Sequence, residues 1–263
     1  MWADIRAKWI GIRYKYRKPL AEFAATAIMI AFGCGAVAQT VLSANNTWFS
    51  VSLAWGLGVT IAVHVAGGVS GAHLNPAVTF ALALFRGFPW ADLPIYWVAQ
   101  ISGAFVGALV VYVANCSALR AADREKTMGV FFTARQTAEV STVDAFVYEF
   151  IATALLLIII LATTDKKNNP AGVIQPLTMG LSITLIGTAF GYQTGYAINP
   201  ARDLGPRFFT AISGWGFGVF SRQDYYFWVP IVAPLLGATA GACVYDVFIC
   251  SSDPKTDDTE HIC

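Results

Sequence analysis

Long, nearly uninterrupted runs of apolar residues dominate the hydrophobic pattern of this chain. Six of these runs have about twenty residues, the length that an α-helix needs to cross the hydrocarbon core of a bilayer. The predicted spans are residues 20–42, 48–67, 94–115, 143–163, 173–192 and 227–250. The pattern therefore predicts an all-α membrane protein with six transmembrane helices.

Two shorter apolar stretches, 74–85 and 199–212, reach only about halfway across a bilayer. Both carry the triplet Asn-Pro-Ala at their start. Asn is a favoured helix N-cap, and Pro is favoured at the first helical position because no N–H is needed there. We expect two re-entrant half-helices, whose triplets are Asn75, Pro76, Ala77, Asn199, Pro200 and Ala201.

The chain also repeats itself. The sequence around Glu22 recurs around Glu149, the two triplets correspond, and a Gly-Ala-x-x-Gly-Ala pattern at Gly103 recurs at Gly237. Matches in the same order indicate a duplicated unit. Because each unit holds three spans, the second enters the membrane from the opposite side, and the half-helices meet near the midplane. We expect an inverted internal repeat.

Composition and charge exclude several classes of protein. Hydrophobic residues make up 56% and charged residues 13% of the chain, whereas soluble proteins have about 25% charged residues. The net charge of +1 offers no basic surface for nucleic acid. The five cysteines form no CxxC pair, and no nucleophile–base set accompanies a motif, so we expect no enzyme activity, metal or cofactor.

The sequences beside the two triplets resemble a known family. Ser-Gly-Ala-His-Leu precedes the first triplet at 70–74, and Arg-Asp-Leu-Gly-Pro-Arg follows the second at 202–207. With the duplicated triplets, they resemble the aquaporin or major intrinsic protein family, and within it the glycerol-conducting branch, the aquaglyceroporins. The resemblance implies an aquaporin-like fold and a homotetramer with one pore per subunit.

Two half-helices that meet have the chemistry of a pore for neutral molecules. Helix N-termini carry partial positive charge, which disfavours cations, and the amides of Asn75 and Asn199 can donate N–H groups to a passing hydroxyl. Water held between two donors cannot form a proton wire. The glycine-rich segments 67–72 and 191–195 are expected to be extended, with carbonyls turned inward.

The resemblance assigns a selectivity filter to Trp55, Gly187, Tyr196 and Arg202. Arg202 would donate to hydroxyl groups and repel cations, while Trp55 and Tyr196 would contact C–H groups, which a polyol has and water lacks. Water-selective relatives place His opposite the Arg, whereas Gly187 is expected to leave that wall open. These features favour glycerol, other small neutral solutes and water as permeants.

Four further residues are predicted to support the pore. Glu22 and Glu149 are expected to accept backbone N–H groups of the adjoining pore loops, the alternative being a proton relay. His73 is expected to brace the first loop rather than gate it. Asp203, like Arg207, matches the aquaglyceroporin pattern.

These features divide the chain into two tails and a channel domain at 20–250. The tails are 1–19 and 251–263, and the channel domain consists of repeat one, a loop and repeat two, at 20–115, 116–142 and 143–250. Lys and Arg lie mainly on the side of the tails, so the positive-inside rule predicts cytoplasmic termini, although the 116–142 loop carries four cations. We expect an integral plasma-membrane protein.

A passive channel for glycerol and water that excludes ions and protons is the leading hypothesis. The alternatives are a strictly water-selective pore and an ion-coupled secondary transporter. A transporter of that kind needs a carboxylate at its substrate site, whereas Glu22 and Glu149 lie far along the chain from the triplets. Asn45 and Asn115 begin possible glycosylation sequons.

Overall fold

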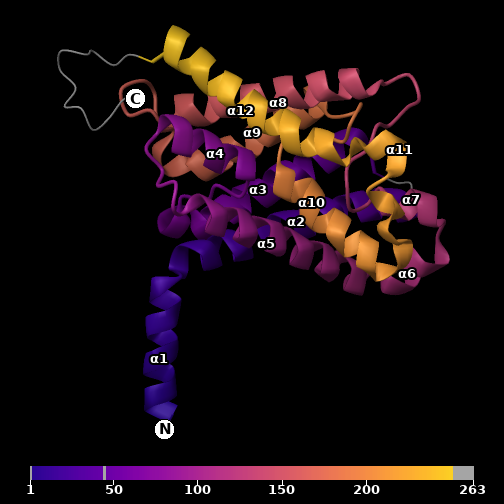
Figure 1. Cartoon of the computed structure of the whole chain (residues 1–263), viewed down its shortest axis with the longest axis horizontal. Coiled ribbons are helices and arrows are strands. Elements are labelled where there is room, and N and C mark those ends of the chain that lie inside the picture. Colours follow the sequence, from indigo (N-terminus) through magenta and orange to yellow (C-terminus); the bar gives the residue numbers. More distant parts are fainter. Residues whose placement is uncertain (1, 44–45, 251–263) are drawn as a thin grey trace.

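The computed structural model describes residues 2–43 and 46–250, so Asn45 and the predicted tail at 251–263 lie outside the described residues. Within them, six helices are long and apolar enough to cross a membrane. Four are the helices α2 (Arg17–Ser43), α3 (Trp48–Ser70), α5 (Leu93–Ala114) and α8 (Thr142–Thr164). The other two, Gly172–Phe190 and Arg222–Phe248, consist of α9 (Gln175–Phe190) and α12 (Val229–Phe248) with the short helices before them. These helices run side by side in one elongated bundle (Figure 1), which confirms the predicted six-span fold.

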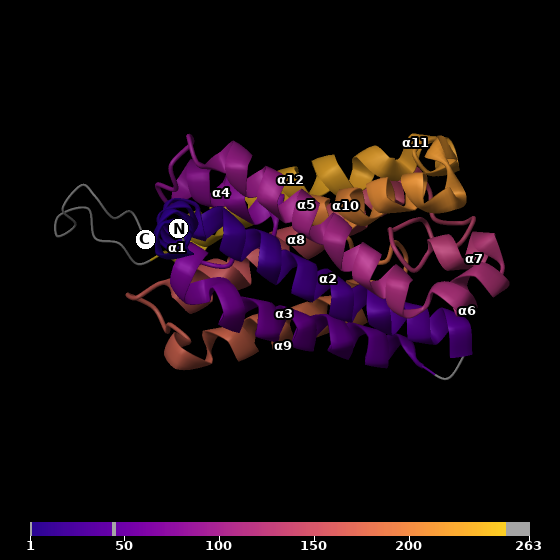
Figure 2. The same cartoon turned by 90° about the horizontal axis from the view of Figure 1, so that it is seen from below.

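Two shorter helices, α4 (Pro76–Phe85) and α10 (Pro200–Thr210), are largely buried against the long ones. Each begins at the proline of its triplet, with Asn75 or Asn199 as N-cap. The two helices lie in opposite halves of the bundle along its long axis (Figures 1 and 2). The first begins at residue 76 rather than 74, because Leu74 has a φ of 56°, outside the right-handed helical region.

The two ends of the bundle differ in structure. Helix α1 (Trp2–Lys15) and the last turn of α12 lie at one end, here called the terminal end (Figure 1). Three short helices lie at the other end, here called the loop end: α6 (Cys116–Ala121), α7 (Arg124–Met128) and α11 (Arg222–Tyr225). Short 3-10 helices at Gly172–Ile174, Phe217–Val219 and Tyr226–Trp228 and a π-helical turn at Ala211–Trp215 complete the described helices.

The segments before the triplets are not extended, contrary to the sequence-based expectation. Helix α3 continues through Gly67 to Ser70, and the N–H of Gly71 still donates to the Gly67 carbonyl at 3.2 Å. The segment 191–195 forms a turn in which the Gly195 N–H donates to the Gly191 carbonyl at 2.8 Å. Gly71 and Gly195 have φ values of 88° and 86°, which glycine adopts at no steric cost, so the chain reverses within a few residues.

Within each repeat, an equivalent glycine brings two helices into close contact. A Cβ at Gly103 in α5 would collide with the carbonyl oxygen of Phe23 in α2. A Cβ at Gly237 in α12 would collide with the carbonyl oxygen of Phe150 in α8. Both helix pairs therefore pack backbone against backbone, as small residues allow in a membrane.

Gly103→Ala is expected to destabilise the protein by about 1–3 kcal/mol, because α2 and α5 must separate to admit the methyl group. Gly68→Ala in α3 is the matched control, since a Cβ there meets no atom within 4 Å, and it is expected to be neutral or stabilising by about 0.5–1 kcal/mol. Thermal unfolding in detergent measures both. Equal unfolding midpoints for the two variants would contradict the close packing.

Candidate functional site

The two half-helices meet through their asparagine side chains. Asn75 accepts the Ala77 N–H at its Oδ1 (2.9 Å) and donates from Nδ2 to the Ile198 carbonyl (2.8 Å). Asn199 accepts the Ala201 N–H at its Oδ1 (2.9 Å) and donates from Nδ2 to the Leu74 carbonyl (2.8 Å). Because an amide nitrogen carries two N–H groups, each asparagine keeps one donor for another partner.

Two buried carboxylates hold the loops that lead into the triplets. Glu22 accepts the N–H groups of His73 (2.9 Å) and Leu74 (2.7 Å), and also the hydroxyl of Ser70 (2.6 Å). A side-chain N–H of Gln100 donates to Glu22 as well, at 2.9 Å.

Glu149 makes the equivalent set of contacts in the second repeat. It accepts the N–H groups of Ala197 (2.8 Å) and Ile198 (2.7 Å) and the hydroxyl of Thr194 (2.7 Å). The N–H and C=O of one trans peptide point in opposite directions. Each N–H directed at a carboxylate therefore turns the preceding carbonyl away from it.

The same loops contain strained backbone at matching positions. Ala72 and Tyr196 have φ values of 50° and 36°, and Leu74 and Ile198 have values of 56° and 42°. Non-glycine residues in this region cost about 1–3 kcal/mol each unless their surroundings fix them. The hydrogen bonds to Glu22 and Glu149 supply that constraint.

The side chain of His73, in the first loop, packs against two aromatic rings. Its Nδ1 is 3.2 Å from the hydroxyl of Thr79, and its ring packs on Phe88 and Tyr96 with centroid distances of 4.9 and 5.1 Å. Gln100 donates to the same Thr79 hydroxyl at 3.0 Å. The imidazole thus connects the loop to α4 and α5.

Trp55 of α3, Gly187 of α9, Tyr196 of the second loop and Arg202 of α10 come together toward the loop end. The guanidinium carbon of Arg202 lies 4.3 Å from the centre of the Trp55 ring. A Cβ at Gly187 would lie 2.8 Å from Cζ of Tyr196. The sequence suggested that the wall beside Gly187 is open. It is not, because the phenol ring of Tyr196 occupies the space there.

The ring of Tyr196 is held in place by Trp48. The two rings pack edge to face at 5.8 Å, and the Trp48 indole N–H donates to the Gly187 carbonyl at 2.8 Å. Trp48 is thus a site residue that sequence reasoning missed. A Trp at the start of a span is common at the membrane interface, so its position alone did not mark it as a site residue.

A buried ion pair lies directly behind Arg202. Both side chains of the pair, Asp203 and Arg207, are at most 1% exposed, and Nε of Arg207 donates to Asp203 at 2.7 Å. Arg207 also donates to the carbonyls of Thr133 (2.8 Å) and Val219 (2.7 Å), and the Thr133 N–H donates to Asp203 (2.9 Å). Each charge is therefore paired and hydrogen-bonded, as a buried charge requires.

The ion pair fixes a segment that sequence analysis left unassigned. Val130–Thr133, within the predicted 116–142 loop, is almost fully buried in the bundle. The carbonyl of Phe131 accepts Nη1 of Arg202 at 3.2 Å. The short apolar run Val-Phe-Phe in a polar loop was the available signal, but its partner Arg202 lies 71 residues away.

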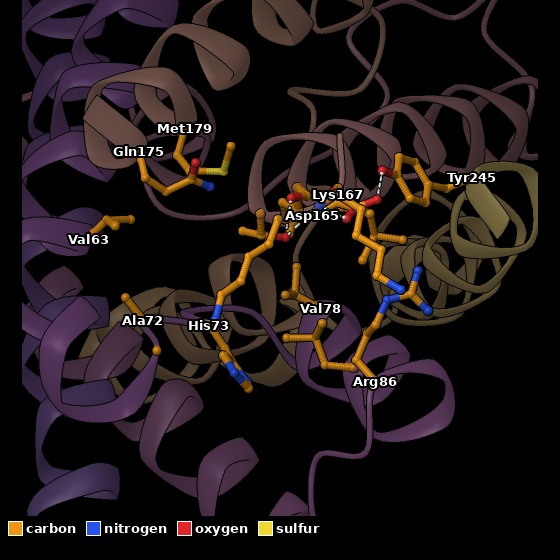
Figure 3. A pocket seen from close by; sticks show the side chains of 16 residues that line it. Val63, Ala72, His73, Val78, Arg86, Asp165, Lys167, Gln175, Met179 and Tyr245 are labelled. Carbon is orange, nitrogen blue, oxygen red and sulfur yellow. Dashed lines mark hydrogen bonds between the residues drawn. The ribbon is translucent and has the colours of Figure 1, made fainter. Parts of the chain in front are cut away.

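A series of cavities leads to the asparagine pair from the terminal end. The first has a volume of about 630 Å³, and Figure 3 shows His73, Arg86, Lys167 and Tyr245 around it. It shares Ala72 and His73 with a cavity of about 70 Å³ that is lined by both Asn75 and Asn199. These two cavities provide a path from the terminal end to the middle of the bundle.

A further cavity of about 410 Å³ opens at the loop end, lined by residues that include Trp48, Phe132 and Arg135. Trp55, Tyr196 and Arg202 line neither this cavity nor the one at the asparagine pair. These three side chains are at most 8% exposed, and they separate the two cavities. Three of the four residues assigned to the filter are therefore the candidate constriction of the path.

Comparisons with known proteins agree on one family. Residues 11–245 match the family model described as Major intrinsic protein. Aquaglyceroporin-2 of Rhizophagus irregularis is 43% identical over 90% of this chain and 78% of that protein, and Aquaporin-6 of Laccaria bicolor is 43% identical over 91% and 82%. The X-ray structure of the aquaglyceroporin from Plasmodium falciparum superposes with a TM-score of 0.81, at 36% identity, over 89% of this chain and 96% of that one.

Arg207→Met is expected to destabilise the protein by about 3–5 kcal/mol, because it leaves the Asp203 carboxylate buried without a counter-charge. The double variant Arg207→Met/Asp203→Leu should recover part of the loss. Arg222→Met is the control, since its ion pair with Glu125 is exposed and worth at most about 1 kcal/mol. Thermal unfolding in detergent compares the three variants. If Arg207→Met loses no more stability than Arg222→Met, the stabilising role of the buried pair is refuted.

Proposed function

The chain belongs to the major intrinsic protein family, and within this family of membrane channels we propose that it conducts glycerol, other small neutral solutes and water. The observation that carries the proposal is the contact of Arg202 with Trp55, at 4.3 Å, beside the ring of Tyr196. This constriction offers N–H donors and apolar ring surface next to each other. A glycerol molecule has hydroxyl groups for the first and C–H groups for the second.

Arg202 is well placed to act on the permeant. One guanidinium nitrogen is held by the Phe131 carbonyl and the backbone N–H by Asn199. The guanidinium has five N–H donors and no acceptor, so donors remain for solute hydroxyls. Its positive charge opposes the entry of cations at this constriction.

The asparagine pair supports the exclusion of protons. Asn75 and Asn199 each keep one N–H donor at the tips of two helices, whose N-terminal ends carry partial positive charge. A water molecule there accepts an N–H from both asparagines, so its oxygen is not free to accept a proton from the next water in the file. A proton wire is interrupted at this position.

A strictly water-selective pore is the second candidate, and one observation favours it. The ring of Tyr196 fills the space beside Gly187, which narrows the constriction on the side where a polyol needs room. The names of the relatives also divide between aquaglyceroporin and aquaporin. The width of the constriction beside Tyr196 thus decides whether glycerol passes as well as water.

The remaining features of the proposal follow from the same family and from the charge pattern. We propose a homotetramer in the plasma membrane, with the terminal end on the cytoplasmic side. The residues 20–250 form the channel domain, and Glu22, His73, Glu149 and Asp203 support its pore. The contacts of these four side chains with the pore loops and with Arg207 support that role.

Proteoliposomes that contain the protein are expected to shrink in a sucrose gradient and then to re-swell rapidly when glycerol is supplied outside. Gly187→Ala should reduce glycerol permeability about tenfold and water permeability less, because the added methyl group displaces Tyr196 into the path at a cost of about 1–3 kcal/mol. Stopped-flow light scattering measures both rates. Gly68→Ala serves as the control.

Failure of the unsubstituted protein to re-swell, with water flux intact, would reject glycerol in favour of the water-selective pore. Equal losses of both fluxes in Gly187→Ala, relative to its control, would show that Tyr196 does not discriminate between them.

Arg202→Val is expected to raise proton and cation leak, because it removes the fixed positive charge from the constriction. A pH-sensitive dye inside the proteoliposomes measures the leak under an imposed pH gradient. Arg222→Met, which removes a cation from the loop-end cavity instead, is the control. Equal proton leak in Arg202→Val and the control would refute the assigned role of Arg202.

A further inference from the structure

Helix α1 stands apart from the bundle. All of its described side chains are exposed. It runs across the direction of the spans rather than along it, and in Figure 2 it is seen end-on (Figures 1 and 2). Because it lies at the terminal end, just before α2 enters the membrane, it has the direction of a helix that lies along a bilayer surface.

One face of α1 carries an apolar stripe, and Ile10 and Tyr14 lie exposed on the other side, so the helix as a whole is not strongly amphipathic. The spacing of its residues alternates between three and four, which places them on one side of a helix. The stripe consists of Trp2, Ile5, Trp9, Ile12 and the following turn residue Tyr16. The most exposed of these, Trp2, has 80% of its surface accessible. Trp and Tyr are the side chains enriched at the headgroup level of a membrane.

Basic residues line both edges of the stripe. Arg6 and Arg13 follow it on one edge, and Lys8 and Lys15 on the other. Six of the 17 Lys and Arg residues of the chain fall within its first 18 residues, together with a single acid. Trp and Tyr rings flanked by cations match the boundary of a membrane, with the rings at the headgroup level and the positive charges against anionic headgroups.

The same charges disfavour a second copy of α1 as the partner. Two such stripes packed together would bring the cationic edges of both helices into contact, where like charges repel. We infer that α1 is an interfacial helix that binds anionic phospholipid in the leaflet at the terminal end. This inference does not depend on which solute the channel conducts.

The junction between α1 and α2 prepares the helix for this contact. The guanidinium of Arg17 lies 4.3 Å from the centre of the Tyr14 ring, and its Nη1 donates to the Tyr14 carbonyl at 2.9 Å. The chain changes direction here, at Tyr16. Since the turn is already formed, docking orders little additional chain, and such preorganisation favours binding.

The test uses the full-length protein in proteoliposomes, with its native cysteines replaced by serine. Ile12→Cys, on the stripe, and Gly11→Cys, on the opposite face, each carry an environment-sensitive fluorophore. Gly11 is a suitable control because a Cβ there meets no atom within 4 Å. Quenching by nitroxide-labelled lipid is measured in phosphatidylcholine vesicles with and without phosphatidylserine.

Strong quenching is expected at position 12, and little at position 11, only when phosphatidylserine is present. High salt should reverse it, because the screening length falls to about 3 Å at 1 M. Replacing Arg6, Lys8, Arg13 and Lys15 by Gln should abolish the dependence on phosphatidylserine, since each cation strengthens binding to an anionic surface about fivefold.

Two results would overturn the inference. Equal quenching with and without phosphatidylserine would mean that the stripe is buried in lipid without recognising anionic headgroups. A label at position 12 that is shielded from aqueous quencher but is not quenched by nitroxide-labelled lipid, with or without phosphatidylserine, would mean that protein, and not lipid, covers the stripe.

Discussion

The structure depends on the exchange of hydrogen bonds between the tips of two half-helices. Asn75 donates to the Ile198 carbonyl, and Asn199 donates to the Leu74 carbonyl. An unpaired backbone group in the apolar centre of a membrane costs several kcal/mol. A helix can therefore end at that depth only where another segment satisfies its backbone. Each repeat supplies the donor that the other lacks, and neither repeat forms the site alone.

The carboxylates of Glu22 and Glu149 apply the same constraint to the loops that precede the tips. By accepting backbone N–H groups they fix Ala72 and Tyr196 in the left-handed region and turn the neighbouring carbonyls away. A charge buried in the bundle here has a structural use. Their duplicated roles explain why both acids lie within spans.

The two halves share a backbone but differ in chemistry. The fourth residue after each asparagine is Thr79 in the first half and Asp203 in the second. Thr79 contacts His73, which lines the cavity at the terminal end. Asp203 instead binds Arg207 and Thr133, and so holds the segment that contacts Arg202. The same scaffold thus forms a wide cavity on one side of the asparagine pair and a constriction on the other.

The sequence by itself determined the six spans, the half-helices at Asn75 and Asn199 and their inverted relation, because length, capping and duplication are local or periodic properties of the chain. It also identified the four residues that meet at the constriction, through a resemblance of motifs. Only the tertiary structure decided that Tyr196 fills the space beside Gly187, that Phe131 reaches Arg202 and that α3 continues to Ser70. These features arise from contacts between residues distant in the chain, and such contacts leave no periodic signal in one sequence.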